Sequence, residues 1–97
     1  MELNMEFRVL ILKALVSDFN FCRRFIDVLQ IDYFDMAHEK IIFKHIKSYF
    51  TTYKKLPIIE EFMQIANADI KNDSLLEKVI KMIYRNKSIN LDYISEE

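Results

Sequence analysis

Apolar side chains recur every three or four residues between Ala37 and Tyr53, and lysines occupy many of the positions between them. Successive residues of an α-helix are rotated by about 100°, so this spacing predicts a long helix with one buried and one solvated face. The predicted buried face comprises Ile42, Ile46, Tyr49, Phe50 and Tyr53, with Phe43 on its flank. The opposite face carries four lysines, Lys40, Lys44, Lys47 and Lys54. The helix should end before Pro57, because the residue preceding a proline avoids the helical region.

Two further helices are predicted before this one. From Asn4 to Val16 apolar residues cover most of the helix circumference, interrupted only by Arg8 and Lys13, so we expect the central buried helix here. After a break at Ser17-Asp18, a second helix is predicted over residues 19–29, and its buried side chains are Phe21, Cys22, Phe25, Ile26 and Leu29. Residues 30–36 form a connector, and we expect Tyr33 and Phe34 of this connector to fill the core.

The sequence after Pro57 predicts two more complete helices. The first spans about residues 58–68. The second opens with the capping-box pattern of Ser74 and Glu77, with Asp73 beside it, and ends near Asn86. Its predicted buried side chains are Leu76, Val79, Ile80 and Ile83.

A last helix is predicted over residues 91–97, with Asn90 as its cap. A helix that begins with a good cap and stops after two turns suggests that the chain is truncated there. The predicted fold is therefore all-α, a compact orthogonal bundle of five to six helices in a single domain over residues 1–97.

Composition restricts the function classes. The 97 residues include no glycine, so neither G-x-G-x-x-G nor G-x-x-x-x-G-K-[ST] can occur, and we expect this chain not to be an enzyme that hydrolyses nucleotides. Fourteen basic and fifteen acidic residues give a net charge of −1, so little DNA binding by this domain alone is expected. No apolar run approaches the about 18 residues of a membrane span, and the N-terminus is not a signal peptide, which predicts a cytoplasmic protein without a membrane partner.

No catalytic, cofactor-binding or metal-binding residues are predicted. Cys22 is the only cysteine, and its helical spacing places it among apolar residues, as expected of a structural thiol. His38 and His45 lie two helical turns apart, about 10.5 Å, which is too far for two ligands of one zinc ion. Glu60 and Glu61 are adjacent, so they diverge on a helix, and a helix-start charge is a simpler interpretation than acid–base catalysis.

The four lysines of the predicted helix over 37–53 form the one surface feature with functional potential. We call Lys40, Lys44, Lys47 and Lys54 the lysine ridge. It is either an ordinary solvated face or a docking surface for an acidic partner or a nucleic-acid backbone. No arginine fork or exposed aromatic residue is interleaved with it, so base recognition is not expected.

Several features carry a family resemblance along the whole chain. In order, they are Leu10 to Val16, Asp18, Phe21 and Phe25, Asp32-Tyr33-Phe34, Ala37-His38, Ile42-Phe43-Lys44-His45-Ile46-Lys47-Ser48-Tyr49, Tyr53 to Pro57, and Glu60-Glu61. Together they resemble the amino-terminal domain of replicative DNA helicases of the DnaB type, in the version encoded by T-even-like bacteriophages. One departure is Ile58, where the family favours a Ser or Thr cap, and it puts the capping of the following helix in question.

The resemblance implies a non-catalytic head domain, cut off before a helical hairpin and an ATP-dependent motor. Such a head forms the collar of a hexameric ring by self-association, offers contacts for primase and loader proteins, and needs no cofactor. An independent small helical adaptor that binds another protein is the alternative. A nucleic-acid-binding helical domain, and lastly an enzyme, also remain open.

Overall fold

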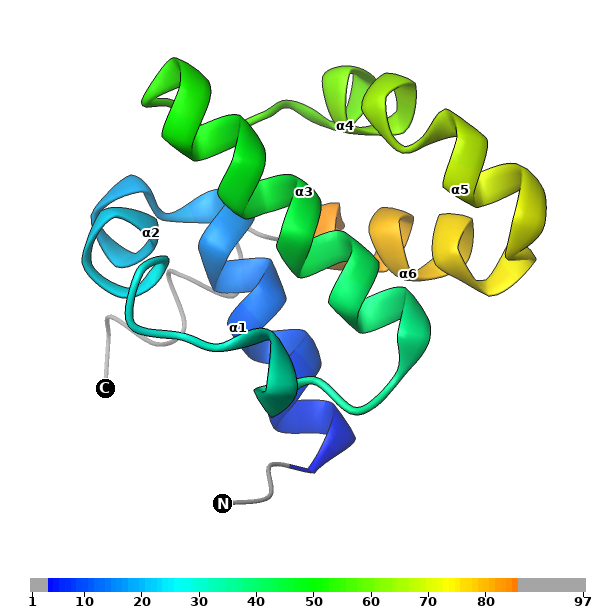
Figure 1. Cartoon of the computed structure of the whole chain (residues 1–97), viewed down its shortest axis with the longest axis horizontal. Coiled ribbons are helices and arrows are strands. Elements are labelled where there is room, and N and C mark those ends of the chain that lie inside the picture. The colour runs from blue at the N-terminus through cyan, green and yellow to red at the C-terminus, as the bar shows by residue number, and fades with distance from the viewer. Residues whose placement is uncertain (1–3, 86–97) are drawn as a thin grey trace.

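Six α-helices and one 3₁₀-helix make up most of the computed structural model, which describes residues 4–85 (Figure 1). In chain order they are α1 (Met5–Ser17), α2 (Phe19–Phe25), η1 (Ile31–Tyr33), α3 (Ala37–Tyr53), α4 (Ile59–Ile65), α5 (Asn67–Asn72) and α6 (Ser74–Tyr84). Residues 4–85 contain no strand, so the prediction of an all-α bundle of five to six helices is confirmed. The helix predicted over 91–97 lies outside the described residues.

Side-chain caps define the first two helices. The Asn4 side chain accepts a hydrogen bond from the Phe7 N–H at 2.8 Å, which opens α1. The Asp18 carboxylate accepts from the Phe21 N–H at 3.1 Å and opens α2 in the same way. Asp18 also follows the last residue of α1, so the predicted break at Ser17-Asp18 is confirmed.

Helix α2 is shorter than the predicted helix over 19–29. The Phe25 carbonyl accepts hydrogen bonds from the N–H groups of both Val28 and Leu29, at 3.0 and 2.9 Å. The chain therefore tightens into a turn after Phe25 and does not continue as a helix. Of the side chains predicted to be buried here, Cys22 and Ile26 are buried, whereas Phe21, Phe25 and Leu29 are partly buried.

Helices α1, α3 and α6 pack against one another and build the core. In Figure 1, α3 crosses in front of α1, with α2 on one side of it and α4 and α5 on the other. Phe34 comes from the connector and is fully buried, as predicted, while Tyr33 packs against the core from its edge. Fully buried apolar side chains from the helices include Leu12, Leu15, Ile42, Ile46, Phe62, Leu76, Ile80 and Ile83.

Two burial predictions are wrong. Helix α1 is central, because it packs against α2, α3 and α6, but it is buried on one face only, and Leu10 within the predicted buried run is 41% exposed. Tyr53 was predicted on the buried face of α3, yet it is 60% exposed. It lies in the last turn of α3, where its ring packs on the Tyr49 ring at a centroid distance of 4.6 Å and not on the core.

The helix predicted over 58–68 is instead two helices, α4 and α5, which meet at Ala66. The Ala66 N–H donates to the Phe62 carbonyl, and the Ala66 carbonyl accepts from the Ile70 N–H, both at 2.9 Å. Ala66 thus ends one helix and begins the next, and its side chain is fully buried at the junction. The change of direction lets both short helices pack against α6.

Helix α6 begins at Ser74, but the capping residue differs from the prediction. The Asp73 carboxylate accepts a hydrogen bond from the Leu75 N–H at 3.1 Å, so Asp73 and not Ser74 is the cap. Glu77 does not complete a capping box, because its carboxylate pairs with Lys81 one turn later at 3.0 Å. The predicted buried residues Leu76, Val79, Ile80 and Ile83 are all buried.

Within residues 4–85, every helix is too short or too polar to cross a lipid bilayer.

Candidate partner-binding surface

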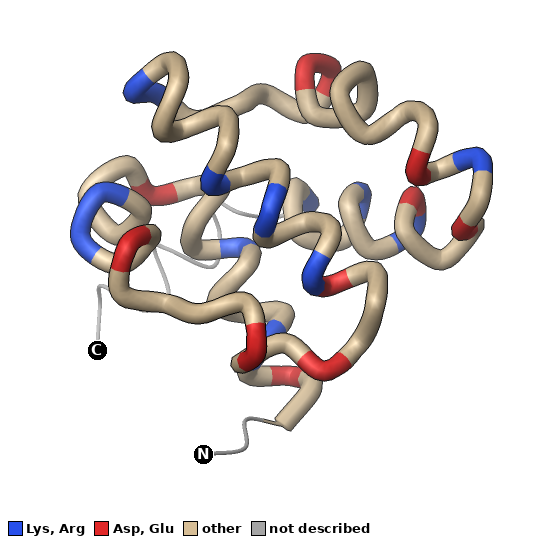
Figure 2. The backbone as a smooth tube through the Cα atoms, in the orientation of Figure 1, with Lys and Arg blue, Asp and Glu red and all other residues tan. Residues whose placement is uncertain are grey.

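The lysine ridge lies along α3 and just past its end, where basic residues follow one another in Figure 2. Lys40 is partly buried, and its amino group donates a hydrogen bond to the Phe34 carbonyl. Lys44 is exposed and Lys47 is partly buried. Lys54 follows the last helical residue in the left-handed conformation, with φ 57° and ψ 31°. The four lysines thus have different surroundings, and only two of them share a concave surface.

That concave surface is a hollow of about 440 Å³ between α3 and the segment that precedes and opens η1. We call it the α3 hollow. Three apolar side chains line it, Leu29, Ile31 and Phe43, together with five polar ones, Asp27, Gln30, Lys44, Lys47 and Ser48.

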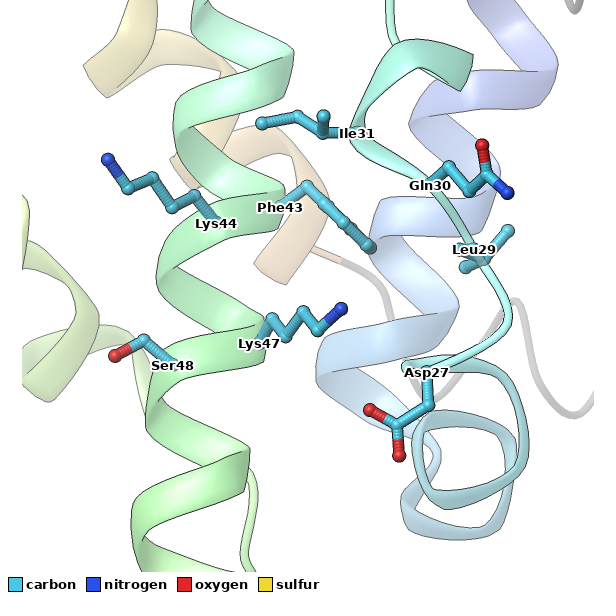
Figure 3. A pocket seen from close by; sticks show the side chains of 8 residues that line it. All are labelled: Asp27, Leu29, Gln30, Ile31, Phe43, Lys44, Lys47 and Ser48. Atoms are coloured by element: carbon cyan, nitrogen blue, oxygen red, sulfur yellow. The ribbon is translucent and has the colours of Figure 1, made fainter.

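Figure 3 shows how these side chains lie. Ile31 extends from the connector toward α3, and Lys47 extends from α3 toward Asp27 on the facing segment. Lys44 points outward from the far flank of α3. Because Phe43 is almost fully buried, it forms the floor of the hollow, while Ile31 is 41% exposed at its edge.

The connector is held against α3 at one end of the hollow. The Phe34 ring packs on the Phe43 ring at a centroid distance of 5.0 Å, and Lys40 bonds to the carbonyl of the same Phe34. Within η1, the Phe34 N–H donates to the Ile31 carbonyl at 3.1 Å. These contacts hold Ile31 in place relative to α3 at the edge of the hollow.

The two sides of the hollow carry opposite charge. Lys44 and Lys47 lie on the α3 side, and Asp27 lies on the facing segment. Asp32 and Asp35 are exposed farther along the same connector. A ligand that fits here needs negative charge toward α3 and neutral or positive charge toward the connector.

A second polar cluster joins the end of α3 to the turn before α4. The Tyr49 hydroxyl donates to Glu61 Oε1 at 2.8 Å, and the same oxygen accepts from the Ile58 N–H at 3.1 Å. The Tyr84 hydroxyl of α6 donates to the Pro57 carbonyl at 2.8 Å. Ile58 has no side chain that can cap α4, so Glu61 supplies the acceptor for the Ile58 N–H. This answers how α4 is capped without the Ser or Thr expected at position 58.

The pKa values of this cluster fit a structural role. The hydrogen bond from Tyr49, then that from the Ile58 N–H, lowers the pKa of Glu61. Burial, followed by the hydrogen bond to Glu61, raises the pKa of Tyr49 to about 12. Burial also raises the pKa of Tyr84. Both phenols therefore stay protonated near neutral pH and hold helices together, and neither is poised as a general base.

The two histidines and the cysteine have structural partners or are buried. His45 Nε2 lies 2.8 Å from Asp69 Oδ2 and links α3 to α5, while His38 is buried near the start of α3. Within residues 4–85, no three His, Cys, Asp or Glu side chains are grouped so that they could hold a metal ion. Cys22 is fully buried, and burial raises the pKa of its thiol to about 11, which fits the predicted structural thiol.

Sequence reasoning missed two features. The α3 hollow depends on a connector that folds back on α3, and no residue spacing along the chain indicates it. The ion pair between Arg8 and Glu39 is buried, with Arg8 Nε 2.7 Å from Glu39 Oε1. An arginine inside an otherwise apolar helix was a usable signal, because a buried charge needs a partner.

Models of known protein families, curated proteins and solved structures were all compared with this chain, and none of them matches.

Proposed function

We propose that this chain is the non-catalytic N-terminal domain of a phage replicative DNA helicase of the DnaB type. In that role it forms part of the collar of a hexameric ring, docks primase or loader proteins, and works in the cytoplasm of the host cell. The ATP-dependent motor would lie on a separate domain that follows this one.

The observation that carries the proposal is that several residues shared with DnaB-type helicase heads lie at contacts between helices. Phe34 of the Asp32-Tyr33-Phe34 motif is fully buried against Phe43 of the α3 motif. Tyr49 bonds to Glu61 across the proline turn, and Tyr84 bonds to the carbonyl of Pro57. Several of the positions that carry the resemblance thus join α3 to its neighbours, which supports a shared arrangement of helices, whereas Tyr53 is exposed.

A protein-binding role fits the surface better than catalysis. The chain has no glycine and therefore no phosphate-binding loop of the usual kinds. The α3 hollow offers an exposed apolar edge and two lysines, which are features of a docking surface. The independent adaptor is the second candidate, because the same hollow serves it equally well without a motor domain.

Reading the gene beyond codon 97 separates these candidates. A downstream G-x-x-x-x-G-K-[ST] after a predicted strand supports the helicase, whereas a stop codon at that point contradicts it and favours the adaptor.

Purified protein gives a second test. We expect residues 1–97 alone to show no ATP turnover, and the longer gene product to hydrolyse ATP and assemble into a ring by light scattering. Deletion of residues 1–97 should weaken ring assembly while ATP hydrolysis persists. An unchanged oligomeric state after that deletion would contradict the collar role.

A further inference from the structure

We propose that the α3 hollow binds a segment of a partner protein that places an apolar side chain against Ile31 and Phe43 and a carboxylate beside Lys47, with Lys44 at the outer rim. This inference rests on the protein-binding part of the proposed function and names the chemistry of the partner.

The apolar part of the hollow calls for an apolar anchor. Ile31 is 41% exposed at the edge, Leu29 is partly buried, and Phe43 closes the floor. The volume of about 440 Å³ falls in the lower part of the range of about 300–1,000 Å³ seen for ligand pockets. A leucine- or phenylalanine-sized side chain seated here would remove the exposed face of Ile31 from water.

The charges select a carboxylate on the α3 side. Within residues 4–85, neither Lys44 nor Lys47 forms an ion pair with an acidic side chain. The Lys47 amino group, which extends toward the facing segment, is therefore available to a carboxylate of the partner, whereas Lys44 points outward at the rim. Charge-assisted hydrogen bonds of this kind are about twice as strong as neutral ones, so they orient the bound segment.

The opposite side of the hollow argues against nucleic acid. A phosphate backbone lying in the hollow would meet Asp27 in the lining, with Asp32 and Asp35 farther along the connector. The lining holds two lysines, no arginine and no aromatic face for base stacking, since Phe43 is buried. A peptide can instead present a carboxylate to α3 and a neutral or basic side chain to Asp27.

Preorganisation favours binding of such a segment. The contacts of Phe34 with Phe43 and Lys40 hold the connector in place, so little ordering of this chain accompanies binding.

The test is a selection of displayed linear peptides on the full 97-residue chain, followed by fluorescence anisotropy with synthetic copies of the enriched sequences. We expect enriched peptides that combine an apolar residue with an acidic one. Lys44→Glu/Lys47→Glu and, separately, Ile31→Asp should weaken their binding by about tenfold or more, the effect of losing about 1.4 kcal/mol. All three positions are exposed or partly buried, so the variants should fold, and circular dichroism checks this.

Residues of α5 and α6 that do not line the hollow provide matched controls. Met82 on α6 is 42% exposed, close to the exposure of Ile31, and Lys71 and Lys78 are exposed lysines on α5 and α6. Met82→Asp and Lys71→Glu/Lys78→Glu should leave the peptide affinity within about twofold, well under the tenfold effect that 1.4 kcal/mol gives. A peptide whose acidic residue is changed to lysine should bind the Lys44→Glu/Lys47→Glu variant better than it binds the wild type.

Three outcomes overturn the proposal. The first is that no peptide is enriched. The second is that the enriched peptides bind the hollow variants as tightly as the wild type. The third is that a single-stranded oligonucleotide binds the wild type and not these variants, which would assign the hollow to nucleic acid. None of these outcomes depends on the gene sequence past codon 97, which tests the helicase assignment. Failure of this inference is therefore distinguishable from failure of the helicase assignment.

Discussion

Arg8 and Glu39, thirty-one residues apart in the chain, meet inside the bundle, where Arg8 Nε donates to Glu39 Oε1 at 2.7 Å. Both side chains are buried, and Arg8 Nη1 also lies 3.5 Å from the exposed Asp35 carboxylate. Glu39 Oε1 accepts a second hydrogen bond from the Met36 N–H at 3.1 Å, at the start of α3. One carboxylate thus joins α1 to α3 and caps α3.

Replacing Arg8 by methionine should destabilise the fold by about 3–5 kcal/mol, because the Glu39 carboxylate is then buried without its ionic partner. Chemical denaturation with a two-state fit measures this change in the free energy of unfolding.

The double variant Arg8→Met/Glu39→Gln is the matched control for that prediction. Glutamine keeps an oxygen acceptor for the Met36 N–H but removes the buried charge. We expect the double variant to be more stable than Arg8→Met alone. If the double variant is instead the less stable of the two, the buried charge is not what makes the single change costly.

The buried face of α3 supports a second prediction. Phe43→Ala and Ile46→Ala should each destabilise by about 2–5 kcal/mol, since both side chains are buried in the core and truncation leaves a cavity. Lys44→Ala, on the exposed side of the same helix, should change the free energy of unfolding by no more than about 0.5 kcal/mol. A larger loss for Lys44→Ala than for Phe43→Ala would reverse the assigned orientation of α3.

Local signals in the sequence predicted the elements that depend on local physics. The spacing of apolar residues gave the bounds Ala37 and Tyr53 for α3, and Asp18 was identified at the break between the first two helices. In both cases the determining signal lies within a few residues along the chain. For α3 it is the helical spacing of apolar side chains, and for Asp18 it is the hydrogen bond that caps a helix.

The features that sequence reasoning missed depend on distant residues. Alanine has the highest helix propensity, so nothing local places a helix break at Ala66, which follows from burial of that residue where α4 and α5 turn over α6. Arg8 is partnered by a residue on another helix, and the α3 hollow forms only when Ile31 is brought against α3. Tertiary packing decides all three.

The hydrogen bonds to Glu61 give a pH-dependent prediction. The pKa of Glu61 in the folded protein lies below its ordinary value of 4.5, chiefly because the Tyr49 hydroxyl donates to the carboxylate. The resulting stabilisation is fully present above the ordinary value and is lost as the pH falls through the lower, folded-state pKa. The stability difference between wild type and Glu61→Gln should therefore stay constant from about pH 7 to about pH 5 and shrink as the pH falls further, through the folded-state pKa.

Urea denaturation across that pH range tests this prediction. Glu60→Gln is the matched control, because Glu60 is exposed in the same first turn of α4, and the Tyr49 and Ile58 donors bond to Glu61. A Glu61→Gln difference that stays constant below about pH 5 as well would show that the carboxylate contributes no charge-dependent stability.

Lys54 is the one residue among 4–85 with a positive φ, and glycine is absent from the whole chain. It ends α3 in the left-handed conformation, and its N–H donates to the Phe50 carbonyl at 2.8 Å. A Cβ atom in this conformation destabilises the folded state by about 1–2 kcal/mol. Glycine removes that strain, but the greater conformational entropy of its unfolded chain offsets about 0.5–1 kcal/mol of the gain. Lys54→Gly should therefore raise the free energy of unfolding by about 0.5–1 kcal/mol.

The neighbouring residue makes this last prediction specific. Lys55 has a negative φ, so Lys55→Gly gains nothing from the missing Cβ and should be neutral or destabilising. Lys54→Asn should fall between Lys54→Gly and the wild type, because asparagine tolerates the left-handed region better than lysine does. Lys54 does not line the α3 hollow, so all three variants should keep the affinity for peptides that bind there. Thermal unfolding measures the change in stability, and fluorescence anisotropy on the same samples measures peptide affinity. A Lys54→Gly variant less stable than Lys55→Gly would show that Lys54 is not strained at the end of α3.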